Sequence, residues 1–233
     1  MSLLTALVTV LALDPGPQIR LKVDLTYATT HQVRLKAAPA HGGTGAPLAP
    51  ARVALALDAR LPVAVSRPAL EEAAAIWAPY GVKIVPLATS PCPPWDEAND
   101  AILTVRVTDL AVSPSAWSSP FASIRFLPDG RPEPTILLHY EALTSLGLNS
   151  VTLNGVRVSQ TPPAVRDRVL ARMIGRVLAH EIGHWLLGTR THSARGLMRA
   201  FQSTSDLADF GRAGFVLVPT DIVRLREALT PAH

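Results

Sequence analysis

Residues 161–188 read TPPAVRDRVLARMIGRVLAHEIGHWLLG and hold the strongest helix signal in the chain. Apolar residues recur every four positions in two sets, which are Val165, Val169, Met173 and Val177, and Leu170, Ile174, Leu178, Ile182 and Leu186. This spacing predicts a helix with a broad buried face. Thr161 suits the N-cap and Pro162 the first helical position. Gly188 suits the end of the helix, because glycine adopts the left-handed conformation there.

The end of this helix carries His180-Glu181-Ile182-Gly183-His184, an H-E-x-x-H pattern. Two histidines at i and i+4 differ by about 40° around a helix, so both imidazoles point the same way. Their ring nitrogens can then bind one Zn²⁺ at about 2.0–2.1 Å. Glu181 lies about 100° from His180 around the helix and is positioned as a base rather than a ligand.

Residues 180–198 resemble the metzincin clan of zinc metallopeptidases, whose pattern is H-E-x-x-H-x-x-G-x-x-H followed by a Met-turn. The matching residues are His180, Glu181, His184, Gly188, His192 and Met198. The His192-Ser193 pair and the Gly196-Leu197-Met198 turn look matrixin-like. The segment is also similar to uncharacterised bacterial proteins that carry H-E-x-G-H-x-L-L-G-x-x-x-H-S-x-x-G-I/L-M.

The resemblance implies His180, His184 and His192 as zinc ligands, with Met198 as a structural floor that binds no metal. It also implies an α+β zincin-like domain, in which a small mixed twisted sheet accompanies a long active-site helix and a C-terminal helix. The implied activity is that of a zinc metalloendopeptidase acting on peptides or proteins, with Glu181 as general base toward a zinc-activated water. Two alternatives stay open, namely a non-catalytic zinc or peptide-binding module and a small-molecule amide hydrolase. The presence of Glu181 favours catalysis over the binding module.

The spacing departs from the metzincin pattern by one extra residue on each side of Gly188. An extra helical residue rotates the exit of the chain by about 100°, and an extra loop residue can restore the reach of His192. The competing third ligand is a glutamate from a later helix, as in the gluzincin pattern, and Glu227 is the candidate.

The remaining elements are expected in the order strand, helix, several strands, long helix and closing helix. The expected strands are 53–65, 82–85, 101–107, 121–127 and 135–139, and the expected shorter helices are 66–78, 141–146 and 221–229. Ser66 and Thr220 are the expected N-caps of the first and last of these helices. Pro79 and Gly81 end the first helix, residues 88–100 form a loop, and Pro128-Asp129-Gly130 is a turn.

Several residues are candidates for roles around the site. A substrate is expected to lie along 121–127 as an added strand, with 201–218 as the other wall of the cleft. His139 ends a strand before the long helix, and a place in the cleft is the less favoured alternative to an ordinary buried histidine. Arginines that surround His192 are expected to be solvated, although one could touch a substrate carboxylate; they are Arg190, Arg195 and Arg199.

The composition and charge of the chain exclude several kinds of protein and of site. The chain has 233 residues, of which 48% are hydrophobic, enough for a sizeable core. Its net charge of +4 is spread along the sequence without a basic run, so nucleic-acid binding is not expected. Cys92 is the single cysteine, which excludes an internal disulfide and a cysteine-based zinc site. We interpret Cys92 as a loop residue rather than a pro-segment switch.

The N-terminal part is expected to lie outside the catalytic domain. Residues 1–12 resemble a signal peptide with an apolar segment that is too short to span a bilayer. A secreted or periplasmic monomer is therefore expected, with a cytoplasmic protein as the alternative. Residues 13–50 are an extension or linker rich in Gly, Pro and Ala toward its end, and residues 51–233 are the expected catalytic domain.

Overall fold

The computed structural model describes residues 51–87, 100–108, 121–200 and 203–230, and within them a five-stranded mixed sheet. The strand order is β2-β1-β3-β5-β4. The strands are β1 (Arg52–Leu57), β2 (Lys83–Pro86), β3 (Asp100–Val107), β4 (Ala122–Phe126) and β5 (Pro132–Leu138). Every neighbouring pair is parallel except β4 and β5, which are antiparallel. Strand β4 is thus an edge strand of the sheet.

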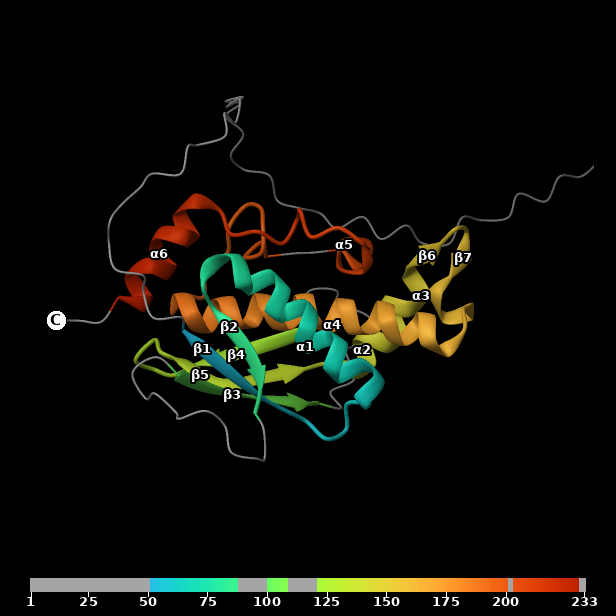
Figure 1. Ribbon diagram of the computed structural model, residues 1–233, viewed down its shortest axis with the longest axis horizontal. Helices are drawn as coiled ribbons and strands as arrows, with labels where there is room; N and C mark the ends of the chain where they lie inside the picture. The colour runs from blue at the N-terminus through green and yellow to red at the C-terminus, as the bar shows by residue number, and fades with distance from the viewer. Residues whose placement is uncertain (1–50, 88–99, 109–120, 201–202, 231–233) are drawn as a thin grey trace, which may run out of the picture. The chain divides into compact units, whose positions relative to one another are not determined.

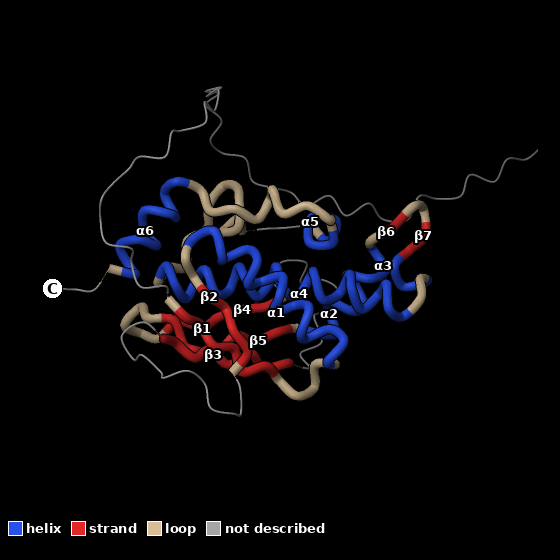
Figure 2. The backbone as a smooth tube through the Cα atoms, in the orientation of Figure 1, coloured by secondary structure: helices blue, strands red, loops and turns tan. Residues whose placement is uncertain are grey.

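Two helices, α1 (Val63–Trp77) and α4 (Pro163–Leu187), pack against each other over one face of the sheet (Figure 1). Helix α6 (Pro219–Leu229) and the short α5 (Thr204–Ala208) lie on the side of α4 away from the sheet, as Figure 2 also shows. The shorter elements are η1 (Ala78–Tyr80), α2 (Tyr140–Ala142), η2 (Leu143–Gly147), α3 (Leu148–Ser150), β6 (Thr152–Leu153), β7 (Val156–Arg157) and η3 (Val158–Gln160). The predicted α+β class, with a small mixed sheet, a long helix and a C-terminal helix, is confirmed.

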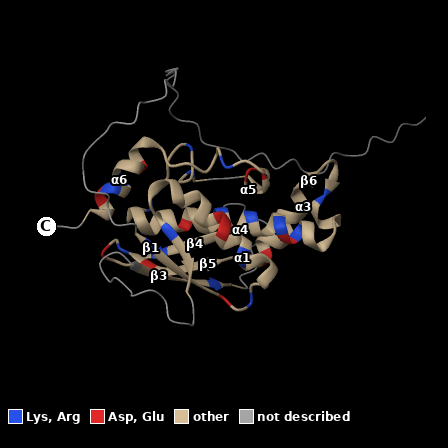
Figure 3. Ribbon diagram, in the orientation of Figure 1, with Lys and Arg blue, Asp and Glu red and all other residues tan. Residues whose placement is uncertain are grey.

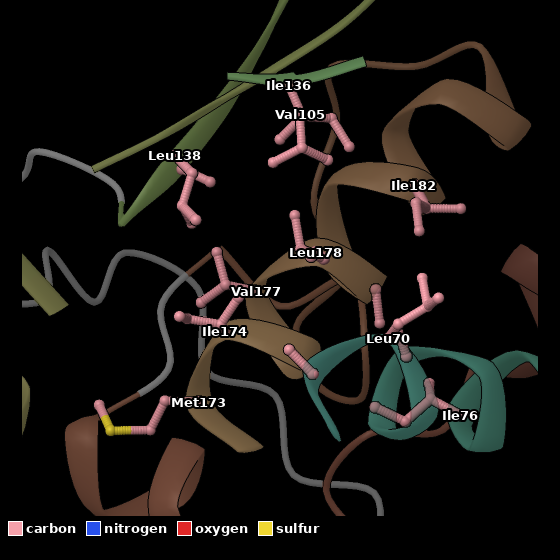
Figure 4. Close-up of a cluster of buried hydrophobic side chains, with 14 of the residues drawn as sticks. Leu70, Ile76, Val105, Ile136, Leu138, Met173, Ile174, Val177, Leu178 and Ile182 are labelled. Carbon is pink, nitrogen blue, oxygen red and sulfur yellow. The ribbon is translucent and has the colours of Figure 1, made fainter. Parts of the chain in front are cut away.

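The core lies between the sheet and the buried face of α4. Figure 4 shows Val105 of β3 and Ile136 and Leu138 of β5 directed toward Leu178 and neighbouring side chains of α4. All four of these side chains are at most 1% exposed. Burial of such aliphatic side chains stabilises the fold by about 1.5–3 kcal/mol each. This packing fixes the rotation of α4 and therefore the direction in which its polar residues point.

The predicted first strand, 53–65, is wrong in its second half. Strand β1 ends at Leu57 because the Asp58 carboxylate accepts hydrogen bonds from the N–H of Arg60 and from the N–H of Val107, which turns the chain. Helix α1 then begins at Val63, with Pro62 rather than Ser66 at the N-cap. The predicted end of this helix is confirmed, because Gly81 adopts a left-handed conformation after the 3₁₀ turn Ala78–Tyr80.

The predicted N-caps of the two later helices are also wrong, and proline explains both. A residue that precedes proline is driven out of the helical region by steric contact with the ring. Pro162 precedes Pro163 and has ψ 149°, so α4 starts at Pro163; the Thr161 hydroxyl instead donates to the Val158 carbonyl oxygen at 2.7 Å. Val218 precedes Pro219 and has ψ 160°, so α6 starts before Thr220 could cap it.

The structure confirms some of the remaining sequence predictions and adds elements that were not predicted. The predicted short helix 141–146 is part of a longer helical run, Tyr140 to Ser150, with a π-helical turn in its middle. The turn at residues 128–130 is confirmed, since the Gly130 N–H donates to the Leu127 carbonyl oxygen. The hairpin β6–β7 and helix α5 have no counterpart in the sequence interpretation. Residues 1–50 and Cys92 lie outside the described residues.

Charged side chains of both signs are interspersed over the described elements, as Figure 3 shows. Within the described residues, each helix is too short or too polar to cross a membrane.

Candidate metal centre

Three histidine side chains converge at the C-terminal end of α4. The Nε2 atom of His184 lies 3.1 Å from Nε2 of His180 and 3.2 Å from Nε2 of His192. His184 is buried, His180 is half-buried and His192 is exposed, so the group opens to solvent on one side. Within the described residues, these three side chains form a group that could hold a metal ion.

Two of the imidazoles are fixed through their other ring nitrogen. Nδ1 of His180 donates to the Leu197 carbonyl oxygen at 2.8 Å, and Nδ1 of His184 donates to the Thr189 carbonyl oxygen at 2.8 Å. A carbonyl oxygen can only accept, so both protons reside on Nδ1 and both Nε2 atoms carry lone pairs. Backbone carbonyls in this position orient the ligating histidines of metal sites.

This arrangement fits a divalent cation such as Zn²⁺. Two lone pairs 3.1 Å apart with no proton between them repel each other, and a cation between them removes the repulsion. Four nitrogens at zinc distance in a tetrahedron lie about 3.3–3.4 Å apart, close to the two separations observed. Burial lowers the pKa of His180 to about 4 and also lowers the pKa of His184 and of His192. All three rings are thus neutral near pH 7, which is the form that binds a metal.

The loop that carries His192 is anchored on both sides. Gly188 adopts φ +57°, which turns the chain sharply after α4. After His192, the Ser193 N–H donates to the Met198 carbonyl oxygen at 2.8 Å, and the Ser193 hydroxyl donates to the Asp221 carboxylate at 2.7 Å. Asp221 is only 2% exposed at the start of α6. Sequence reasoning missed Asp221, since its partner lies 28 residues away.

Met198 lies under the helix between the two histidines of α4. Its side chain is 1% exposed, and its sulfur and terminal methyl occupy the space that a Cβ atom at Gly183 would need. The preceding residue, Leu197, provides the carbonyl that holds His180. The turn around Met198 therefore packs against the part of α4 that carries the two histidines. Among the described interactions, the Met198 sulfur makes no contact with the three Nε2 atoms.

Glu181 is buried beside the edge strand. Its side chain is 6% exposed, and burial raises the pKa of its carboxyl to about 8, although a hydrogen bond from the Ile124 N–H of β4 acts in the opposite direction. The same strand contributes Phe126, whose ring meets the His184 ring edge-on with centroids 6.5 Å apart. Strand β4 thus runs along the histidine group, and the sequence interpretation of 121–127 as an edge is consistent with its place in the sheet.

The remaining candidates do not join the three histidines. Glu227 is exposed on α6 and is not part of the group that could hold a metal. His139 is 9% exposed, and its Nδ1 lies 3.0 Å from the Thr108 hydroxyl. Arg199 forms an ion pair with Asp206 at 2.7 Å. The segment 203–217 packs along α4 on the side away from the sheet, where Leu197 N–H donates to the Val216 carbonyl oxygen (Figure 1).

No family model matches the sequence, and no curated protein matches it either. Among solved structures, the chain is similar to the crystal structure of a zinc-dependent peptidase from Methanocorpusculum labreanum. The two share 18% sequence identity with a TM-score of 0.45, and the match covers 74% of this chain and 99% of the other. So distant a likeness does not bear on the activity of this chain.

Proposed function

We propose that this protein is a zinc-dependent peptidase of the metzincin type, with His180, His184 and His192 as metal ligands and Glu181 as general base. The observation that carries the proposal is the convergence of three Nε2 atoms, two of which lie 3.1 and 3.2 Å from that of His184. The buried Glu181 is next to His180 on the same helix. A purely structural zinc site is normally closed by four protein ligands. Three histidines with one solvent-exposed side instead leave room for a water and a substrate.

The metal supplies two effects when bound, a lowered pKa for water in the site and polarisation of a carbonyl group. Glu181 follows His180 on the helix and accepts a hydrogen bond from Ile124, so its carboxylate is held at the free edge of the sheet. A cation held by the three histidines would favour the ionised form of this carboxyl. In that form Glu181 takes a proton from the attacking water and passes it to the amine that leaves. The water oxygen bonds to the carbonyl carbon as the C–N bond breaks, so one water is consumed for each peptide bond.

The edge of β4 supplies a place for an extended peptide. An edge strand offers unpaired backbone groups to which another strand can add. Phe126 and Ile124 on this strand contact His184 and Glu181 respectively, so a peptide added there runs past the histidine group. Peptides and proteins are therefore the proposed substrates, and we propose endopeptidase action because β4 is the edge strand of the sheet in the described residues.

The test measures bound zinc by elemental analysis and cleavage of casein and of a mixed peptide pool. Wild type should hold one zinc per chain and cleave peptides. Glu181→Ala should keep the zinc and lose at least 100-fold in kcat/KM, as expected for removal of a general base. His192→Ala should lose most of its zinc and its activity together.

His139→Asn is the matched control, because Asn can keep the hydrogen bond to Thr108 while removing an imidazole outside the site. It should retain both zinc and activity. If His192→Ala retains zinc as tightly as wild type, the third ligand is wrongly assigned. If the zinc-loaded wild type cleaves no peptide, the peptidase proposal is wrong, and the non-catalytic module and the small-molecule amide hydrolase are the alternatives that remain.

A further inference from the structure

Arg190 lies between the end of α4 and His192, and its side chain covers an aromatic ring of the edge strand. The guanidinium carbon is 4.9 Å from the centroid of the Phe126 ring. The same ring contacts His184 edge-on at 6.5 Å between centroids. The positive charge of Arg190 is therefore separated from the histidine group by a single aromatic side chain.

The place of Arg190 along β4 puts its guanidinium beside a substrate residue near the scissile bond. Ile124, which hydrogen-bonds Glu181, is two residues from Phe126 on the strand. Two residues of a strand span about 7 Å. A peptide that is added along β4 with its scissile bond at Glu181 therefore brings a residue two or three positions away to the guanidinium of Arg190.

The charge of Arg190 has no acidic partner among the described residues, in contrast to its neighbours. Arg125 on the same strand pairs with Glu133 at 3.2 Å, and Arg199 in the loop after His192 pairs with Asp206 at 2.7 Å. Arg190 is exposed, and its recorded contact is the stacking on Phe126. A guanidinium stacked on a ring keeps its hydrogen-bonding edge free and loses little conformational entropy when it binds a carboxylate.

We infer that Arg190 is a specificity-determining residue that binds a carboxylate of the substrate two or three residues from the scissile bond. The inference rests on the proposed function, because it takes the peptide to lie along β4. The carboxylate has two sources, an acidic side chain within the peptide or a free peptide C-terminus. Either source presents the two oxygens that match the fork of the guanidinium.

Pairs of quenched-fluorescence octapeptides test the inference. In one series, Glu replaces the isosteric Gln at each position in turn, and in the other a free C-terminal acid replaces the amide. Wild type should cleave the carboxylate member about three- to tenfold faster in kcat/KM at one position of one series, the range for a partly exposed charge pair. Arg190→Gln should abolish this preference for the carboxylate member.

Arg195→Gln is the matched control, since it removes an exposed arginine from the same loop. It should keep the ratio of wild type. The inference is wrong if wild type shows no preference in either series, if Arg190→Gln keeps the preference, or if both variants lose it equally, because an equal loss reports net charge alone.

Calorimetric binding of the same peptide pairs to zinc-loaded Glu181→Gln separates the inference from the proposed function. A carboxylate preference in binding that disappears with Arg190→Gln supports the role of Arg190, even if wild type hydrolyses no peptide and the peptidase proposal fails. Equal affinities for both members of every pair overturn the role of Arg190, even if wild type hydrolyses the uncharged peptides well.

Discussion

Glu72→Gln is expected to destabilise the fold strongly, because it removes the charge from a buried carboxylate that pairs with two arginines. Glu72 of α1 lies between two arginines, with Oε1 3.0 Å from Arg176 Nε and Oε2 2.6 Å from Arg212 Nη2. The Arg176 side chain is 0% exposed and that of Glu72 is 9% exposed. The substitution therefore leaves a fully buried guanidinium without its counter-charge.

The other contacts of Arg176 set the size of the effect. Its Nη atoms donate to the carbonyl oxygens of Asp206, Leu207 and Gly211, and its guanidinium stacks on the Phe215 ring at 4.3 Å. These are neutral partners, so they satisfy hydrogen bonds but do not neutralise the charge. Removing one member of a buried ion pair costs about 3–5 kcal/mol. The Gln amide oxygen still accepts one hydrogen bond, which places the expected loss near the lower end of that range.

Urea denaturation at pH 7 measures this loss, and a neighbouring residue provides the control. Glu71→Gln is the same substitution one residue earlier, at a side chain that is 65% exposed and pairs with Arg67 at 3.2 Å. It should change the free energy of unfolding by less than about 1 kcal/mol. If Glu72→Gln unfolds within 1 kcal/mol of wild type, the view of Arg176 as an uncompensated buried charge is wrong.

The same pair makes stability depend on pH in a defined direction. Burial alone raises the pKa of the Glu72 carboxyl, but hydrogen bonds from Arg212 and Arg176 outweigh burial and lower it below its ordinary value. A lowered pKa in the folded state contributes stability that is complete above the unfolded value of about 4.3 and is lost as pH falls through the folded value. The difference between wild type and Glu72→Gln should thus be constant from pH 7 to about pH 5 and shrink below pH 4.

Three further outcomes are expected. Zinc at one hundred times its Kd should stabilise the chelator-treated protein by about 2.7 kcal/mol, which calorimetry would record as a rise of about 5–10 °C in Tm. Gly183→Ala should lower the free energy of unfolding in urea by about 1–3 kcal/mol, because its Cβ meets the Met198 side chain, and Met198→Ala should reduce that loss. Ser193→Ala should cost about 1–3 kcal/mol by removing a donor from the buried Asp221 carboxylate, and it should weaken zinc binding in a competition titration with a chelator.

Local sequence signals account for the long helix and two of its histidines. The four-residue apolar spacing from Val165 to Leu186 is a property of neighbouring turns, and packing against the sheet buries that face as expected. The relation between His180 and His184 follows from the same helical geometry. These features could be predicted because each depends on residues within a few turns of one another.

The hairpin β6–β7 and helix α5 also carry local sequence signals. Asn154-Gly155 is a typical hairpin turn pair, and it connects β6 to β7 with φ +50° at Asn154. Ser203 and Asp206 form the capping box that begins α5. The predicted N-caps at Thr161 and Thr220 are wrong because Pro163 and Pro219 force the residues before them, Pro162 and Val218, out of the helical region.

The approach of His192 to the other two histidines could not be read from the spacing alone, because it depends on how two extra residues are absorbed. Helix α4 ends at Leu187, so the longer helical segment carries the chain past His184 before Gly188 turns it back. The returning loop is compact, because the Thr189 hydroxyl accepts a hydrogen bond from the Thr191 N–H at 3.1 Å while the Thr189 carbonyl oxygen holds His184.

Hydrogen bonds between Thr189 and Thr191 therefore hold the extra loop residue in a closed turn. The residue between them is Arg190, which this turn directs over Phe126 at the edge strand. The longer spacing thus has a structural consequence beyond bringing His192 to 3.2 Å from His184. It creates the loop position from which a positive charge reaches the strand where we propose that the substrate binds.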